Sequence, residues 1–227
     1  MATVMPDTGV RPVPFTPPAT KRQLLREMVN VIEDLPKFAA APLYRRWHQR
    51  WGATPHEVSS PMPGDELIAG AQYQATRAIT IAAPPEAVWP WLIQVGCLRA
   101  GWYSNDLLDN LTRPSAEEVI PELQDLHVGQ WVPMSPTPSD KTAFKVASFE
   151  PNRLLVWQQP VSTWVWALSP TDHGGTRLVT RLRIRYEWRR PVEALLSLVL
   201  NEFGDFPMMR RMLLGVKARA ESPKRGS

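Results

Sequence analysis

The last third of the chain constrains the fold most, because two strand-like runs stand directly ahead of a long helical stretch. Apolar-patterned runs at 164–168 and 177–188 flank a Gly-Gly turn at 173–175. Residues 192–221 then repeat apolar side chains at the helical period. Two strands joined by a short turn pair antiparallel. This order predicts an antiparallel sheet curled around one C-terminal helix, with a lined cavity between them.

The composition is that of a globular protein, with two exceptions. Hydrophobic residues make up 44% and charged residues 21% of the 227 residues, so one well-buried core is expected. The chain also contains 10 Trp and 24 Pro. Tryptophan supplies a large apolar surface with a polar edge, which suits a core or a ligand pocket. The prolines imply many fixed turns.

Cysteine content and apolar run length indicate the compartment. Cys97 is the only cysteine, so no intrachain disulfide forms. The N-terminal residues lack the apolar segment of a secretory signal peptide. No apolar run approaches the roughly 18 residues of a membrane span. The sequence therefore predicts a cytoplasmic protein.

The chain divides into four predicted parts. Residues 1–19 are rich in proline and have little apolar pattern, which indicates a disordered tail. Residues 20–70 are predicted to form a helical extension with a turn-rich lead-in, and residues 71–221 form the main domain. Residues 222–227 are predicted to form a second disordered tail.

Two helices are predicted in the N-terminal extension. Thr20 and Gln23 have the spacing of a capping box at the start of an amphipathic helix over 20–35, which Pro36 is expected to end. A second short helix over 43–51 carries arginines beside an aromatic stripe. Packing of this helix against its own domain is the favoured interpretation, and contact with a membrane surface is the alternative.

Short strands and turn residues alternate through the main domain. A helix that opens at Pro84-Pro85 follows the first strand. No crossover helices separate the later strands, so antiparallel pairing is expected. The predicted strands cover 73–81, 128–134, 142–149, 153–159, 162–169 and 176–188.

The C-terminal helix is predicted to consist of two segments with a break near 204–206. Gly204 and Pro207 oppose a continuous helix, and Asp205 is expected to cap the second segment. Both segments carry an apolar face, and the face of the second segment is expected to point inward. These faces comprise Val192, Leu195, Leu196, Val199, Leu200 and Phe203 in the first segment and Met208, Met209, Met212, Leu213 and Val216 in the second.

The two faces of the last hairpin carry different side chains. If Leu168 pairs with Leu178, Trp164 and Trp166 lie on the inner, apolar side of the sheet. Alternate arginines of the last strand then face the other side, where a solvated surface is favoured over an anion-binding groove. These arginines are Arg177, Arg181, Arg183 and Arg185.

Several segments together match a known pattern. They are Ala75 to Ile81, Ala83 to Leu92, Gly101-Trp102-Tyr103-Ser104, Thr176-Arg177-Leu178 and Met208 to Gly215. In this combination the chain resembles the bacterial polyketide cyclase/dehydrase-like proteins of the SRPBCC superfamily (START/helix-grip) over roughly 47–221. The resemblance implies an α+β helix-grip fold, in which a curved antiparallel sheet wraps around a long C-terminal helix. It also implies an internal cavity for lipids, polyketides, sterols or aromatic compounds.

The predicted ligand site lies in that cavity, on the sheet, the C-terminal helix and the segment after the first helix. Tryptophan and methionine together favour an adaptable apolar pocket. The ligand-binding candidates are Trp102, Tyr103, Trp131, Trp157, Trp164, Trp166, Met208, Met209 and Met212.

Candidates for proton transfer are Tyr103, Asp106 and Glu122, and the two carboxylates would act as an acid/base pair if burial separated their pKa values. The four histidines have no metal-ligand spacing, and surface positions are expected for His48 and His173. The chain has no glycine-rich phosphate loop and no nucleophile elbow. No cofactor, no metal and no nucleic-acid partner are therefore predicted.

The favoured function is binding of a small hydrophobic or aromatic metabolite, lipid-like or polyketide-like, in the cavity between the sheet and the C-terminal helix. One alternative is a cofactor-independent cyclase or dehydratase that acts on a polyketide-like substrate. Another is a membrane-surface or protein-interaction module that uses the basic helices. Peripheral membrane contact is thus a secondary expectation beside the small hydrophobic ligand.

Overall fold

A six-stranded antiparallel sheet forms the centre of the protein. The computed structural model describes residues 16–222, so most of the two predicted tails lies outside the described residues. The strand order is β1-β6-β5-β4-β3-β2, which confirms the antiparallel pairing. The strands are β1 Tyr73–Ile81, β2 Trp131–Pro133, β3 Ala143–Glu150, β4 Leu154–Gln159, β5 Ser162–Pro170 and β6 Thr176–Ile184. All six match predicted strands, although the last ends at Ile184 instead of residue 188.

The pairing of β5 with β6 fixes which side chains enter the core. Leu168 pairs with Leu178, and Trp164 pairs with Leu182, as the sequence predicts. Because side chains alternate along a strand, Trp164 and Trp166 point to the same face of the sheet. They are 8% and 0% exposed, so this face is the buried one.

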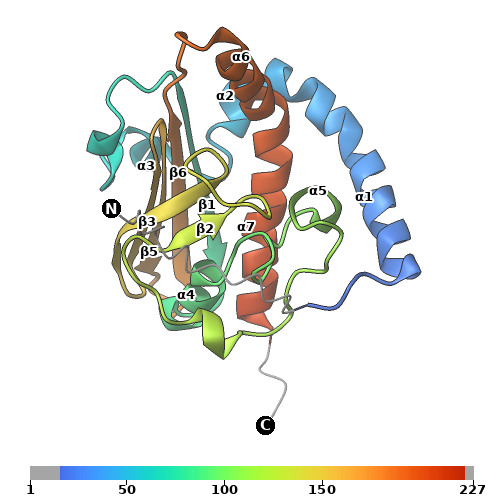
Figure 1. The fold of residues 1–227 in the computed structure, drawn as a ribbon. Helices are drawn as coiled ribbons and strands as arrows, with labels where there is room; N and C mark the ends of the chain where they lie inside the picture. Colours follow the sequence, from blue (N-terminus) through green and yellow to red (C-terminus); the bar gives the residue numbers. More distant parts are fainter. Residues whose placement is uncertain (1–15, 223–227) are drawn as a thin grey trace, which may run out of the picture.

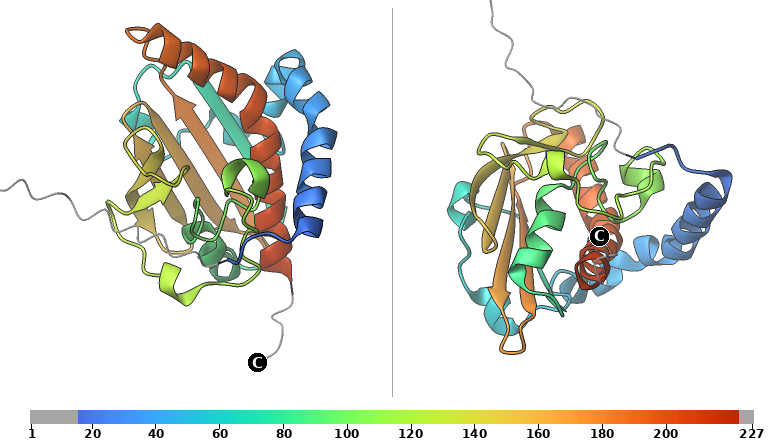
Figure 2. Two further views of the ribbon diagram at one scale, coloured as in Figure 1. Left: turned by 45° about the vertical axis from the view of Figure 1, so that its right-hand side comes forward. Right: turned by 90° about the horizontal axis from the view of Figure 1, so that it is seen from below.

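The helices form two layers beside the sheet. In Figures 1 and 2, α7 lies between the sheet and α1, and α4 packs beside α7. The helix α1 therefore covers α7 and not the sheet edge. The helical elements are α1 Lys21–Ala40, η1 Ala41–Tyr44, α2 Arg45–His48, α3 Pro55–Ser59, η2 Asp65–Leu67, α4 Pro85–Ile93, α5 Asp106–Asp109, η3 Pro121–Leu123, α6 Pro191–Val199, η4 Leu200–Gly204 and α7 Asp205–Glu221.

The first helix starts as predicted but ends later. Thr20 and Gln23 form the capping box, with the Thr20 N–H donating to Gln23 Oε1 at 2.8 Å. The predicted end at Pro36 is wrong, because α1 continues to Ala40. A proline removes only one backbone donor, and packing of α1 against α7, η1 and η4 keeps the chain helical.

The predicted break in the C-terminal helix is also wrong. Gly204 keeps helical backbone angles, and α6 continues into α7 through η4, which is a π-helical turn. A π turn shifts the backbone hydrogen-bond register by one residue, and the helix axis bends here in Figure 2. Asp205 makes no side-chain cap and is instead part of a buried ion pair.

The apolar face predicted for the first segment of the C-terminal helix lies on α6 and η4 and points outward. The helix extends past the ends of the strands (Figure 2), so the described residues leave much of this face uncovered. The side chains are 38–80% exposed. They are Val192, Leu195, Leu196, Val199, Leu200 and Phe203. By contrast, α7 buries Met209, Met212, Leu213 and Val216 as expected, and Met208 is half-buried.

A buried ionic group joins β1 to the start of α7. Arg77 is 1% exposed and its Nη1 lies 2.6 Å from Asp205, whose carboxylate also accepts from the Tyr73 hydroxyl at 2.7 Å. The Nε of Arg77 donates to the His48 carbonyl at 2.8 Å. His48 is 0% exposed and stacks on Phe206, so its predicted surface position is wrong.

The outer face of the sheet is covered instead of solvated. Arg181 is 2% exposed and donates to backbone carbonyls of α3 and to the Asp65 carboxylate at 2.6 Å. Arg177 pairs with Glu57 at 2.7 Å. These arginines therefore fasten the lead-in segment to the sheet. Arg185, beyond the end of β6, is exposed.

Candidate functional site

Four tryptophan rings meet between the sheet and α7. Trp157 comes from β4, Trp164 and Trp166 come from β5, and Trp102 comes from the loop before α5. The ring centroids of neighbouring pairs lie 5.0–6.1 Å apart, and each residue is at most 8% exposed. Phe144 of β3 adds an edge contact to Trp164 at 5.6 Å. We call these five residues the aromatic cluster, and it unites four of the predicted ligand-binding residues.

Hydrogen bonding within the aromatic cluster is incomplete. The indole N–H of Trp164 donates to the Thr180 hydroxyl at 2.9 Å. The indole N–H groups of Trp157 and Trp166 are buried and have no acceptor among the described residues. A buried donor without an acceptor costs about 1–3 kcal/mol, so these two groups need an explanation.

The loop that carries Trp102 has a strained backbone and packs closely on α7. Gly101 and Tyr103 have φ values of 77° and 54°. A Cβ atom on Gly215 would lie 2.4 Å from the Tyr103 carbonyl oxygen, so glycine is needed there for the loop to reach the helix. The Trp102 ring is parallel to the Trp164 ring, with an interplanar angle of 6° and a centroid distance of 5.8 Å.

Tyr103 is anchored by hydrogen bonds away from the aromatic cluster. Its hydroxyl donates to the Trp91 carbonyl at 3.1 Å and accepts from Gln94 Nε2 at 2.8 Å. Burial raises the pKa of this hydroxyl above its ordinary value. A phenol held in this way stays protonated at neutral pH.

The remaining ligand-binding candidates lie in two places. Met209 and Met212 are 4% and 2% exposed on the core side of α7, whereas Met208 is half-buried. Trp131 lies on β2 at the edge of the sheet, where the Lys145 ammonium sits 4.2 Å from its ring centroid. Among the described residues, Trp131 has no ring contact with the aromatic cluster.

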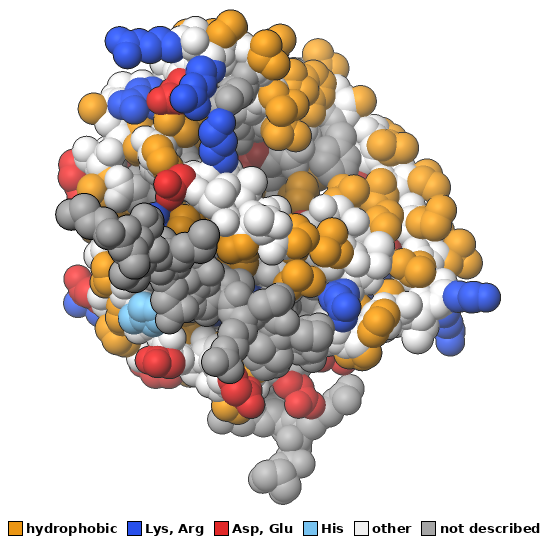
Figure 3. Space-filling model, viewed as in Figure 1, with side chains coloured by type: hydrophobic (Ala, Val, Ile, Leu, Met, Phe, Trp, Pro, Cys, Tyr) orange, Lys and Arg blue, Asp and Glu red, His pale blue; other side chains and the backbone are white. Residues whose placement is uncertain are grey.

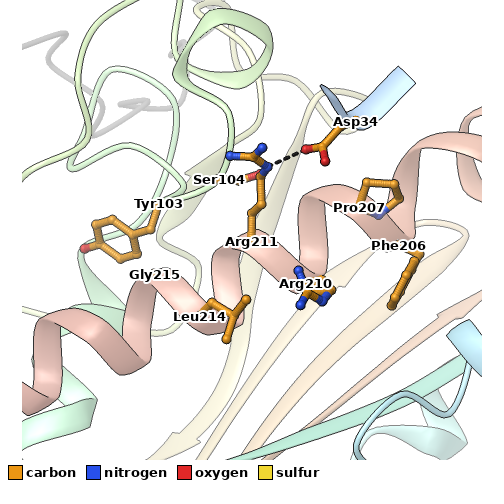
Figure 4. A pocket seen from close by; sticks show the side chains of 9 residues that line it. All are labelled: Asp34, Tyr103, Ser104, Phe206, Pro207, Arg210, Arg211, Leu214 and Gly215. Atoms are coloured by element: carbon orange, nitrogen blue, oxygen red, sulfur yellow. Dashed lines mark hydrogen bonds and ion pairs between the residues drawn. The ribbon is translucent and has the colours of Figure 1, made fainter. Parts of the chain in front are cut away.

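A pocket opens on the opposite side of α7, toward α1. Its volume is about 370 Å³. Asp34 of α1 forms an ion pair with Arg211 of α7 across it, and Figure 4 shows Arg211 reaching toward Asp34. Tyr103 and Ser104, which are adjacent in the sequence, also line this pocket. This pocket does not lie between the sheet and α7, where the cavity is predicted.

The two candidate acid/base carboxylates are not brought together. Asp106 begins α5 and accepts from both the backbone N–H and the hydroxyl of Ser115, at 2.9 and 2.5 Å. Glu122 is exposed in η3. No hydrogen bond connects Asp106 with Glu122 in the described part of the chain.

The sequence gives no signal for a third carboxylate, Asp109. Burial raises the pKa of Asp109 to about 7, and the negative charge of Asp106 adds to the shift. Burial also raises the pKa of Glu27, on the α1 helix that packs against α5. The environment of Asp109 depends on this packing between segments far apart in the sequence, so local pattern could not reveal it.

Within residues 16–222, no group of three or more His, Cys, Asp or Glu side chains is arranged to hold a metal ion. None of the helices in the described part of the chain is long and apolar enough to cross a membrane.

One face of the antiparallel sheet packs against α4 and α7, and a single buried core joins the sheet to these helices. The chain has the helix-grip fold. The predicted α+β class, with its additional N-terminal helices, is therefore confirmed.

Many solved structures are similar to this fold. No family profile and no curated protein matches the chain. It is similar in structure to the Polyketide_cyc-like protein Cgl2372 of Corynebacterium glutamicum, with 17% identity and a TM-score of 0.39 over 68% of this chain and 97% of the other. It is also similar to CV1439 of Chromobacterium violaceum, with 13% identity and a TM-score of 0.39 over 67% of this chain and 100% of the other. A third similar structure is CalU16 of Micromonospora echinospora, with 20% identity and a TM-score of 0.32 over 65% of this chain and 85% of the other.

Proposed function

We propose that the protein binds a small, flat aromatic or hydrophobic molecule carrying a hydrogen-bond acceptor, between the sheet and α7. The observation that carries this proposal is the pair of buried indole N–H groups of Trp157 and Trp166 without an acceptor. A phenylalanine side chain has no polar hydrogen and would not carry that cost. An oxygen atom of a ligand would accept from one or both groups and recover it.

Trp102 defines where such a ligand would lie. Its ring already stacks parallel to Trp164, and it is carried by a loop, whereas the other three rings are fixed on strands. A planar ligand ring that takes the place of Trp102 would keep the same stacking geometry. The loop would then move away from Gly215 to admit it.

Binding is favoured over turnover by the positions of the acid/base candidates. The Asp106 carboxylate is engaged by Ser115, Glu122 is exposed, and the Tyr103 hydroxyl is engaged by Gln94 and held protonated. A cyclase or dehydratase needs a titratable group within hydrogen-bond reach of its substrate. The aromatic cluster contains none.

Calorimetric titration with naphthol tests the proposal, and naphthalene serves as the matched probe without an oxygen. The Trp166→Phe variant removes one N–H donor and keeps an aromatic ring. We expect naphthol to bind it about 5-fold more weakly than the wild type, as for loss of one hydrogen bond of about 1 kcal/mol. Naphthalene affinity should stay the same. Equal naphthol affinity for both proteins would contradict the proposed role of the indole donors.

A further inference from the structure

The outward face of α6, continued by Leu200 of η4, forms one side of a large exposed apolar surface. Val192, Leu196 and Leu200 are 80%, 59% and 61% exposed. Exposed single apolar residues are common on proteins, but a contiguous patch marks an interaction site. These residues follow the helical spacing, so they form a stripe and not a scatter.

The apolar surface continues onto the neighbouring N-terminal turns. The turn η1 packs against η4, which brings Leu43 and Trp47 next to the α6 stripe. Leu43 is 89% exposed and Trp47 is 58% exposed. They line an open groove of about 440 Å³ with Tyr44, Arg45 and Arg46. We call the α6 stripe together with Leu43 and Trp47 the apolar face.

Exposed basic side chains lie in the two segments that flank the apolar face, with one exposed acidic residue, Glu187, among them. Arg46 and Arg50 are exposed on the η1–α2 side, and Arg185 and Arg189 are exposed on the chain that leads into α6. Trp188, between them, is 57% exposed. Figure 3 shows Lys and Arg side chains beside the apolar side chains in the upper part of the view. Residues 43–50 contain three arginines and no acidic residue.

We infer that the apolar face docks on an anionic lipid bilayer. Apolar side chains that insert below the headgroups, tryptophans at the interface and arginines at the rim are the combination that binds such a surface. A second copy of the chain fits less well. A two-fold dimer would place the same arginine rim against itself, and like charges facing each other repel. This inference does not depend on the ligand proposed above.

Vesicle pelleting with the full chain tests the inference. The wild type should pellet with vesicles of phosphatidylcholine and phosphatidylglycerol at low ionic strength, but not with phosphatidylcholine alone, and high salt should release it. The Val192→Asp/Leu196→Asp variant should lose at least about 10-fold in partitioning. Each of Arg46→Gln and Arg189→Gln should cost about 5-fold.

The control places the same charge elsewhere. Val128 is 63% exposed in the loop before β2, outside the apolar face, and Val128→Asp should bind vesicles like the wild type. Circular dichroism and thermal melting establish that each variant is folded. Absence of wild-type binding at low salt, or equal binding of the Val192→Asp/Leu196→Asp variant, would overturn the inference. So would sedimentation data that show a wild-type dimer which this variant dissociates, because the face would then belong to a second copy.

Discussion

Arg181 illustrates how one buried side chain can fasten a whole segment. Its guanidinium is 2% exposed and has acceptors in three elements: Thr76 of β1, the backbone of α3, and Asp65 of η2. The planar fork of arginine donates in several directions at once. A buried charge that has all these partners is stabilising only while they remain in place.

Arg181→Lys should therefore be destabilising although the charge is kept. A lysine ammonium has three donors at one point and cannot reach all the acceptors, so we expect a loss of about 2–4 kcal/mol in the free energy of unfolding. Urea denaturation measures it. The matched control is Arg185→Lys, because Arg185 belongs to the same series of alternate arginines but is exposed just after β6. This substitution should change the free energy of unfolding by no more than about 0.5 kcal/mol. Equal effects of the two substitutions would show that the network does not fasten the segment.

Strand alternation predicts correctly which face these arginines take but not what covers that face. The partner of Arg181 in η2, Asp65, lies 116 residues away in the sequence. Nothing local to β6 indicates that α3 and η2 return to its outer side. The same reason explains His48, which is buried because Phe206 of α7 packs on its ring.

At the scale of elements, the contact between α1 and α5 couples the fold to pH. Burial raises the pKa of Asp109 from 3.8 to about 7. In the unfolded chain this carboxyl ionises near its ordinary value, so between about pH 4 and 7 the native protein binds more protons than the unfolded one. Stability therefore falls as pH rises through this window.

Asp109→Asn should remove most of this dependence. We expect the variant to be more stable than the wild type at pH 7 and to show a flatter stability profile between pH 4 and 7, because no carboxylate needs to ionise inside the contact. Urea denaturation at a series of pH values measures the profile. Asp125→Asn, at an exposed position, is the control and should keep the wild-type slope. Parallel profiles for wild type and Asp109→Asn would show that this carboxyl is not responsible.

Periodicity predicts the type of an element better than its ends. All six strands and the start of α1 follow from side-chain pattern, because alternation and capping are local. The π-helical turn at η4 does not follow from pattern, since Gly204 and Pro207 read as helix breakers. The outward face of α6 also escapes prediction, because amphipathic spacing shows that a face is apolar but not which surface it meets.

For the whole molecule, the layers separate the proposed activities. The sheet and α7 enclose the aromatic cluster, whereas the exposed apolar stripe lies on α6, past the bend in the same helix (Figure 2). The register of β5 and β6, and with it the inward position of Trp164 and Trp166, could be predicted from sequence. The closure of the space by Trp102 could not, because it depends on how a loop packs against Gly215.

The most direct test of ligand binding is proton–nitrogen NMR of the indole groups of the 10 tryptophans during titration with naphthol. Trp157→Phe and Trp166→Phe variants assign the two signals of interest. We predict that these two signals shift as their N–H groups gain an acceptor, while the signal of the exposed Trp188 stays in place. If saturating naphthol shifted only the indole signals of exposed tryptophans, or shifted no indole signal, the result would contradict the proposed site.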